Sequence, residues 1–143
     1  MIKRFLLLGL IFSLAILMIG CTPTPRADLM VLNLEPPDVN CGLVLKDRVA
    51  PCNTTVTFTI VNVGPADAGS FKVLIQADPG LAQQAIVNIA SLASGASTTR
   101  TIILPPSGNC FDPDCTICIT VDSYNEVIES NEGNNYYCET TLG

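Results

Sequence analysis

The sequence predicts a small all-β protein in which two sheets pack face to face. Beyond the first twenty residues, short runs rich in Val, Ile, Thr and Phe alternate apolar with polar side chains, which is the period of a half-buried strand. Pro, Gly, Asn and Asp separate these runs at short intervals. Helical periodicity is hard to find in the same region. Together these observations predict an immunoglobulin-like β-sandwich of seven strands, without the Trp of antibody domains.

The first twenty residues follow a different pattern and predict a secretory signal peptide. Lys3 and Arg4 form a basic head, and the segment 5–19 is almost entirely apolar. A membrane-spanning helix needs about 20 apolar residues, so this segment better fits the apolar region of a signal peptide. An uncleaved membrane anchor is the alternative.

This leader ends in Leu17-Met18-Ile19-Gly20-Cys21, which resembles the lipobox of bacterial lipoproteins. The resemblance implies that Cys21 receives a lipid and becomes the new N-terminus. We therefore expect an exported protein, anchored to the cell envelope through the membrane, at the outer membrane or the cell surface. Residues 21–26 would then be the lipidated cysteine and a short, stiff tether rich in Thr and Pro.

The predicted strands follow in order along residues 27–143, which we expect to form one domain. The second strand shows the pattern most clearly, because Val56, Phe58 and Ile60 share one face and threonines occupy the other. Turn residues such as Asn62-Val63-Gly64-Pro65 end the strands. The seven predicted strands cover residues 28–34, 54–63, 70–77, 84–89, 97–104, 116–121 and 135–142.

The charge of the chain argues against a nucleic-acid partner. The full sequence has 7 basic and 13 acidic residues, a net charge of −6. Lys3 and Arg4 would leave with the signal peptide, so the exported part would carry five basic against thirteen acidic residues, a net −8. A surface this negative repels phosphate backbones.

Six cysteines follow Cys21, and an even number in an exported chain predicts a disulfide framework. Many pairings are open, and the pair at the ends of the 41–52 loop is the first expectation, worth about 3 kcal/mol by loop closure. The C-x-x-C at 115–118 could suggest redox or zinc chemistry. Residues three apart in a strand point to opposite faces, so structural disulfides are favoured there. The cysteine-bounded loop 110–115 is either a surface loop that recognises a partner or a turn without a binding role. The candidates are Cys41, Cys52, Cys110, Cys115, Cys118 and Cys138.

Three segments together resemble the CARDB family, named for cell-adhesion-related domains found in bacteria. They read VTFTIVNVGPADAG at 56–69, SLASGASTT at 91–99 and VDSYNEVIESNEGNN at 121–135. The resemblance covers about residues 27–142 and implies an immunoglobulin-like sandwich with an adhesive or scaffolding role on secreted or surface proteins. The six cysteines and the insert at 105–113 depart from the family's usual pattern.

The segment 122–135 is the densest polar cluster in the chain and should connect the last two strands. One interpretation is structural, because Asn and Asp cap backbone groups and tolerate left-handed turns. The other is a Ca²⁺ site, since Ca²⁺ takes six to eight oxygen ligands. The spacing does not fit an EF-hand. The candidate ligands are Asp122, Asn125, Glu129, Asn131 and Glu132, and we expect no other cofactor.

The absence of His from the sequence argues against an enzyme. It excludes Ser-His-Asp and Cys-His arrangements, and the carboxylate pairs lack an apolar context. We therefore expect a non-catalytic, lipid-anchored module for envelope binding or adhesion, whose partner is a protein or a glycan. It would bind through loop tips or an exposed sheet edge. The alternative is a structural or assembly lipoprotein of an envelope complex, with or without stabilisation by Ca²⁺.

Overall fold

The computed structural model describes residues 23–41, 52–78, 84–104 and 114–142. These residues form eight β-strands and no helix, which confirms the predicted all-β class. None of this described part is a helix of the length and apolarity that a bilayer crossing requires. The strands are β1 (Leu29–Leu34), β2 (Asp38–Cys41), β3 (Cys52–Asn62), β4 (Phe71–Ala77), β5 (Gln84–Ile89), β6 (Ser97–Leu104), β7 (Asp114–Thr120) and β8 (Tyr136–Leu142).

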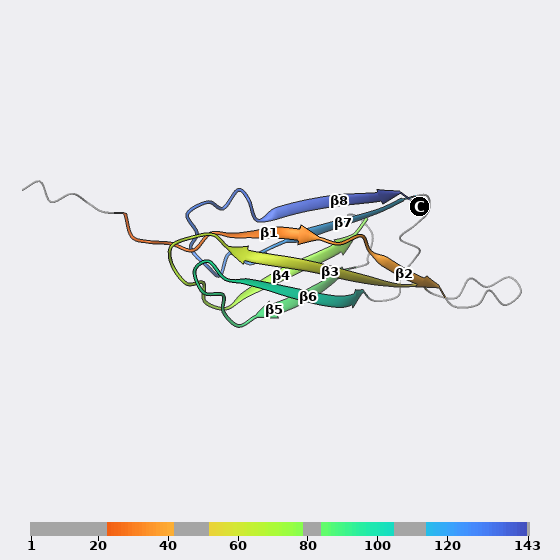
Figure 1. Ribbon diagram of the computed structural model, residues 1–143, viewed down its shortest axis with the longest axis horizontal. Helices are drawn as coiled ribbons and strands as arrows, with labels where there is room; N and C mark the ends of the chain where they lie inside the picture. The colour runs from red at the N-terminus through yellow and green to blue at the C-terminus, as the bar shows by residue number, and fades with distance from the viewer. Residues whose placement is uncertain (1–22, 42–51, 79–83, 105–113, 143) are drawn as a thin grey trace, which may run out of the picture.

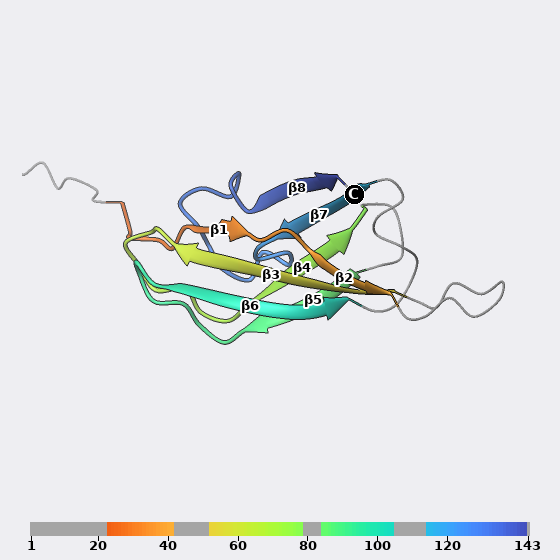
Figure 2. The same cartoon turned by 45° about the vertical axis from the view of Figure 1, so that its right-hand side comes forward.

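The strands form two antiparallel sheets that face each other, as predicted for a sandwich (Figures 1 and 2). In one sheet, β3 pairs with β6 along one edge and with β1 and β2 along the other. The second sheet has the order β5-β4-β7-β8. Seven of the eight strands lie within two residues of the predicted segments at both ends, because alternation identifies a strand with one buried face.

The predicted count of seven strands is short by one, because the first edge strand is split in two. β1 pairs with the second half of β3 and β2 with its first half. Between them lie Pro36 and Pro37, which have no N–H to donate and so interrupt the ladder. The N–H of Glu35 still donates to the carbonyl of Thr57 at 3.0 Å. β1 and β2 therefore act as one broken edge strand.

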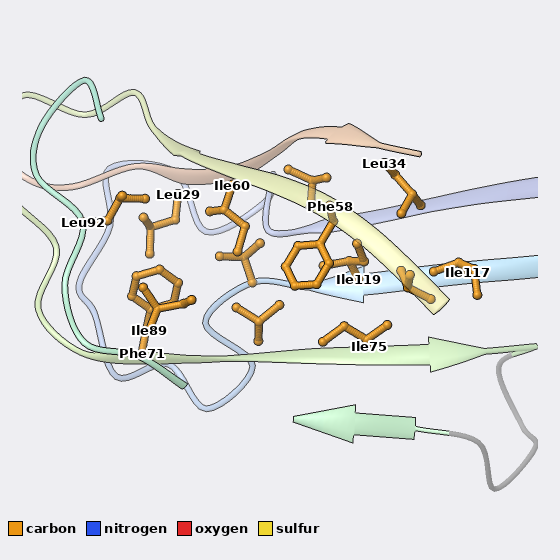
Figure 3. Close-up of a cluster of buried hydrophobic side chains, with 14 of the residues drawn as sticks. Leu29, Leu34, Phe58, Ile60, Phe71, Ile75, Ile89, Leu92, Ile117 and Ile119 are labelled. Carbon is orange, nitrogen blue, oxygen red and sulfur yellow. The ribbon is translucent and has the colours of Figure 1, made fainter. Parts of the chain in front are cut away.

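The core lies between the sheets and consists of the alternate side chains that point inward from each strand. In β3 every second residue is buried, and Phe58 contributes the largest side chain of that strand. Phe71, Ile75 and Ile119 of the opposite sheet belong to the same buried cluster (Figure 3). Burying each such side chain contributes about 1.5–3 kcal/mol, so the core is the main stabilising term.

The connections between strands divide between the two ends of the sandwich. The chain reaches β1 at the end where the β3–β4, β5–β6 and β7–β8 connections also lie (Figure 1). We call this end, made of residues 23–28, 63–70, 90–96 and 121–135, the loop end. The segment 122–135 connects the paired strands β7 and β8, as expected.

A disulfide joins the neighbouring strands β7 and β8. Cys118 of β7 is bonded to Cys138, its direct neighbour on β8, and not to Cys115. Cys52 and Cys115 are also disulfide-bonded. Cys41 is opposite Cys52 in the β2–β3 register, which suits the expected pairing of these two residues; that pairing stays a prediction. Cys110 and most of the 110–115 loop lie outside the described residues.

Candidate functional site

Asp122 begins the β7–β8 connection and holds its first turn. The residue is buried and has a positive φ of 46°, a conformation that Asp tolerates better than most residues. Its Oδ1 accepts a hydrogen bond from the N–H of Glu126, and its Oδ2 accepts one from the N–H of Val127, both at 2.8 Å. The carboxylate therefore satisfies two backbone donors of its own loop.

Glu129 joins the same connection to the start of the fold. Its side chain is buried, and its two carboxyl oxygens accept hydrogen bonds from the N–H of Leu29 and, at 2.9 Å, from Nδ2 of Asn135. The N–H of Ser130 donates to the carbonyl of Ala27 at 2.8 Å. Burial raises the pKa of Glu129, and the two donors oppose that rise. Glu129 thus ties residues about 100 positions apart.

Asn62, at the end of β3, links three further segments of the loop end. Its side chain is fully buried, and Oδ1 accepts from the N–H groups of Asp28 and Gly64 at 3.0 and 3.1 Å. Its Nδ2 donates to the carbonyls of Ala66 and Leu92 at 2.8 and 3.0 Å. From the sequence, Asn62 is expected only as part of a strand-ending turn, and this linking role is not predicted.

The five candidate metal ligands are spread along this connection, and most act as hydrogen-bond acceptors. Besides Asp122 and Glu129, Oδ1 of Asn131 accepts from the N–H of Gly133, and Oε1 of Glu132 accepts from the N–H of Glu129. Asn125 is exposed with a φ of 53°. Among the described residues, no three His, Cys, Asp or Glu side chains are grouped closely enough to hold a metal ion. The arrangement favours the structural interpretation.

Calcium is therefore expected to leave the stability of the protein unchanged. The carboxylates that it would need already accept backbone or amide N–H groups, and binding would have to compete with those hydrogen bonds. The measurement is a series of thermal melts of metal-stripped protein with rising CaCl₂, with MgCl₂ as the ionic-strength control. A melting temperature that climbs with the Ca²⁺ concentration, and no longer climbs in Asn131→Ala, would contradict this prediction.

An open hollow of about 690 Å³ lies at the loop end, between the N-terminal segment and the β3–β4 and β7–β8 connections. Its acidic groups are already engaged: Asp67 accepts from the N–H of Ser94 at 2.8 Å, and Glu126 pairs with Lys72. Both carboxylates that line this hollow therefore already have partners within the protein.

The outer face of the second sheet carries a row of side chains that crosses all four strands. Ile86, Leu74, Thr120 and Tyr136 are successive partners in the registers of β5, β4, β7 and β8. Tyr124 of the β7–β8 connection lines a hollow of about 250 Å³ together with Leu74, Gln84, Ile86 and Ser123. We call the outward residues of this sheet, together with Tyr124, the tyrosine face. Its central positions are Lys72, Leu74, Gln76, Gln84, Ile86, Asn88, Thr116, Cys118, Thr120, Tyr136, Cys138 and Thr140.

Both tyrosines of this face are exposed yet held in position. Tyr124 and Tyr136 are each 59% exposed. Nζ of Lys72 lies 4.7 Å from the ring centroid of Tyr124 and 2.6 Å from Oε1 of Glu126, a hydrogen bond that raises the pKa of Lys72. The hydroxyl of Tyr136 donates to Sγ of Cys118 at 3.3 Å, beside the disulfide. Each ring therefore has one contact that favours the observed side-chain position.

Comparison with known proteins agrees with this architecture. The sequence model of the CARDB family matches residues 26–139. A CARDB domain from Pyrococcus furiosus, whose crystal structure is in complex with di-metal ions, is 22% identical, covers 85% of this chain and 96% of its own, and has a TM-score of 0.55. The solution structure of the same protein's CARDB domain gives 21% identity, coverage of 82% and 94%, and a TM-score of 0.52.

A third similar structure is the solution structure of a domain from Methanosarcina acetivorans. The protein that contains it is described as a cell surface protein. The domain is 27% identical, covers 82% of this chain and 91% of its own, and has a TM-score of 0.59. No curated protein sequence gives a significant match. The solved relatives therefore share the sandwich over nearly their whole length.

Proposed function

This chain belongs to the CARDB family, and from that membership we propose that it is a non-catalytic binding module held at the cell envelope by a lipid on Cys21. The observation that carries the binding role is the tyrosine face, where exposed rings lie on a rigid sheet with no other element over them among the described residues. The relative from Methanosarcina acetivorans, named for the cell surface, supports an extracellular location.

The proposed anchor is compatible with the geometry of the domain. The chain reaches β1 at the loop end, and Cys21 precedes Ala27 by six residues. An extended tether of that length spans about 20 Å at most. The loop end would therefore lie close to the bilayer, and both sheet faces would stand open to the side.

The proposal of a non-catalytic role rests on the ionisable side chains. The chain has no His, and the buried carboxylates of Asp122 and Glu129 are committed to capping hydrogen bonds. A general base needs a proton to accept from a substrate within hydrogen-bond reach. These two groups accept from the protein's own amides instead.

Lipidation of Cys21 is tested by expressing the full chain in a bacterium with a lipoprotein pathway and labelling it with an alkyne fatty acid. The wild-type protein is expected to take up label and sediment with membranes, because two or more acyl chains anchor durably. Cys21→Ser should lose the label and leave the membrane fraction, whereas Thr22→Ser, next to it, should retain both. Label or membrane retention in Cys21→Ser would reject the anchor.

Surface exposure separates a binding module from an assembly component of an envelope complex. Protease treatment of intact cells should release the domain of a surface-exposed module. Protection from protease in intact cells, with digestion after lysis, would instead favour the structural lipoprotein.

A further inference from the structure

Charge distinguishes the tyrosine face from the rest of the molecule. The chain has 13 acidic residues, yet none of the described outward positions within 72–76, 84–88, 116–120 and 136–140 is acidic. Its cation, Lys72, is paired with Glu126. Asp78 and Asp114 follow only at the far edge of the sheet. The part of the face around the two tyrosines therefore carries no net charge on a strongly acidic protein, which matches a ligand that is itself uncharged.

The polar groups of this face suit hydroxyl groups. Gln84 and Asn88 are exposed on β5, and the partly exposed Gln76 is the register partner of Gln84 on β4. Each amide offers both donors and an acceptor, and a hydroxyl group likewise donates and accepts. Leu74 and Ile86 lie between these amides and Tyr124. Apolar contact and amide hydrogen bonding are thus available within one small area.

The aromatic rings add a surface on which a flat apolar face can stack. Tyr124 lines the same hollow as Leu74. Leu74 is in turn separated from Tyr136 by two strand spacings, about 10 Å, with Thr120 between them. A tyrosine ring is apolar on its face and polar at its hydroxyl tip. Sugar rings have the matching chemistry, with C–H groups on their faces and hydroxyls around the rim. A chain of a few sugars could contact both rings.

The same features fit a protein partner less well. A stable protein interface buries about 800 Å² per partner around a desolvated apolar centre. The outward aliphatic residues among the described positions of the central rows are Leu74 and Ile86, and the hollow beside them is about 250 Å³. Small ligand sites of about 300–1,000 Å³ are the nearer comparison.

We propose that the tyrosine face binds a neutral oligosaccharide, with Tyr124 and Tyr136 as stacking platforms and Gln76, Gln84 and Asn88 as hydrogen-bonding groups. This assignment rests on the binding role proposed above and names its ligand class. The Lys72 ammonium and the Cys118–Cys138 disulfide hold the two rings in place, so little ordering is needed on binding.

The test begins with the full-length protein in detergent on an array of neutral hexose oligomers beside sialylated and sulfated ones. Neutral oligomers are expected to bind, and charged analogues to bind no better. In calorimetry with the strongest neutral oligomer, Tyr124→Ala and Tyr136→Ala should each raise Kd by about tenfold, whereas Tyr124→Phe should keep most of the affinity. Tyr137→Ala is the matched control, because Tyr137 lies next along β8 and points to the other face.

The assignment is overturned if no neutral oligomer binds, or if folded Tyr124→Ala and Tyr136→Ala proteins bind as the wild type does. Binding to isolated cell envelopes separates this failure from that of the proposed function. Loss of binding after periodate treatment of the envelopes, but not after protease, supports the oligosaccharide. Loss after protease alone keeps the binding role and rejects the oligosaccharide. No binding to untreated envelopes rejects both.

Discussion

Replacing Asn62 with alanine is expected to lower the free energy of unfolding by about 3–4 kcal/mol, because two N–H groups, one buried and one part-buried, and two carbonyls lose their partner together. Each hydrogen bond contributes about 1 kcal/mol, and each buried donor left without an acceptor costs about 1–3 kcal/mol. The measurement is urea unfolding followed by far-ultraviolet circular dichroism. The loop end should lose protection in hydrogen exchange before the core does.

Two further variants decide whether the amide group itself is needed. Asn62→Asp keeps an acceptor for Asp28 and Gly64 but turns an oxygen toward the carbonyls of Ala66 and Leu92. We expect it to be at least as destabilising as alanine at neutral pH. Asn88→Ala, on the exposed side of β5, should change stability by less than about 0.5 kcal/mol. Near wild-type stability in Asn62→Ala would show that the four hydrogen bonds do not organise the loop end.

The strands could be predicted from the sequence because each has one buried face. In β3, Val56, Phe58 and Ile60 alternate with threonines, and this pattern is independent of the partner strand. β2 could not be found in this way. Its four residues, Asp38 to Cys41, do alternate polar with apolar side chains, but a run of four directly after two prolines is too short to tell a strand from a loop. Its strand conformation depends on backbone pairing with β3.

The polar residues of the loop end could be identified from the sequence, but the hydrogen bonds that each one makes could not be predicted. The composition of 122–135 shows that oxygens are plentiful, but both interpretations of them, capping and Ca²⁺ binding, use the same residues. The distinction depends on which N–H each oxygen meets. For Glu129 that partner is Leu29, at the far end of the sequence. A contact across such a separation follows from the folded arrangement of the strands.

The tyrosine face was missed for a related reason. Tyr124, Tyr136 and Ile86 lie in three different segments of the sequence. They come together only when the registers of β4, β5, β7 and β8 are known, because a shift of one residue would turn any strand's side chains to the other face. The exposed Ile86 was visible in the sequence only as part of a weak strand.

Glu129 gives the second large effect, and the size of its contribution to the free energy of unfolding depends on pH. Burial raises the pKa of Glu129 above its ordinary value of 4.5, so the folded protein keeps this proton where the unfolded chain has lost it. The folded state then binds more protons, and this residue's contribution to the free energy of unfolding falls as the pH rises from 4.5 through the raised pKa. The contribution is fully present below that window.

Glu129→Gln removes this titration and also one acceptor, because the new amide NH₂ meets the N–H of Leu29 or Nδ2 of Asn135. Near pH 4.5 the variant should therefore be less stable than wild type by about 2–3 kcal/mol, the cost of a buried donor without a partner. The difference should narrow as the pH rises, since only the wild type then carries a buried charge. Urea unfolding of both proteins over a series of pH values measures this difference, with Glu139→Gln, at an exposed position of β8, as the control. If the difference widens with rising pH, the two hydrogen bonds outweigh burial and the pKa of Glu129 is lowered. Glu129 would then be a buried carboxylate that stabilises the contact between the β7–β8 connection and β1 in its charged form.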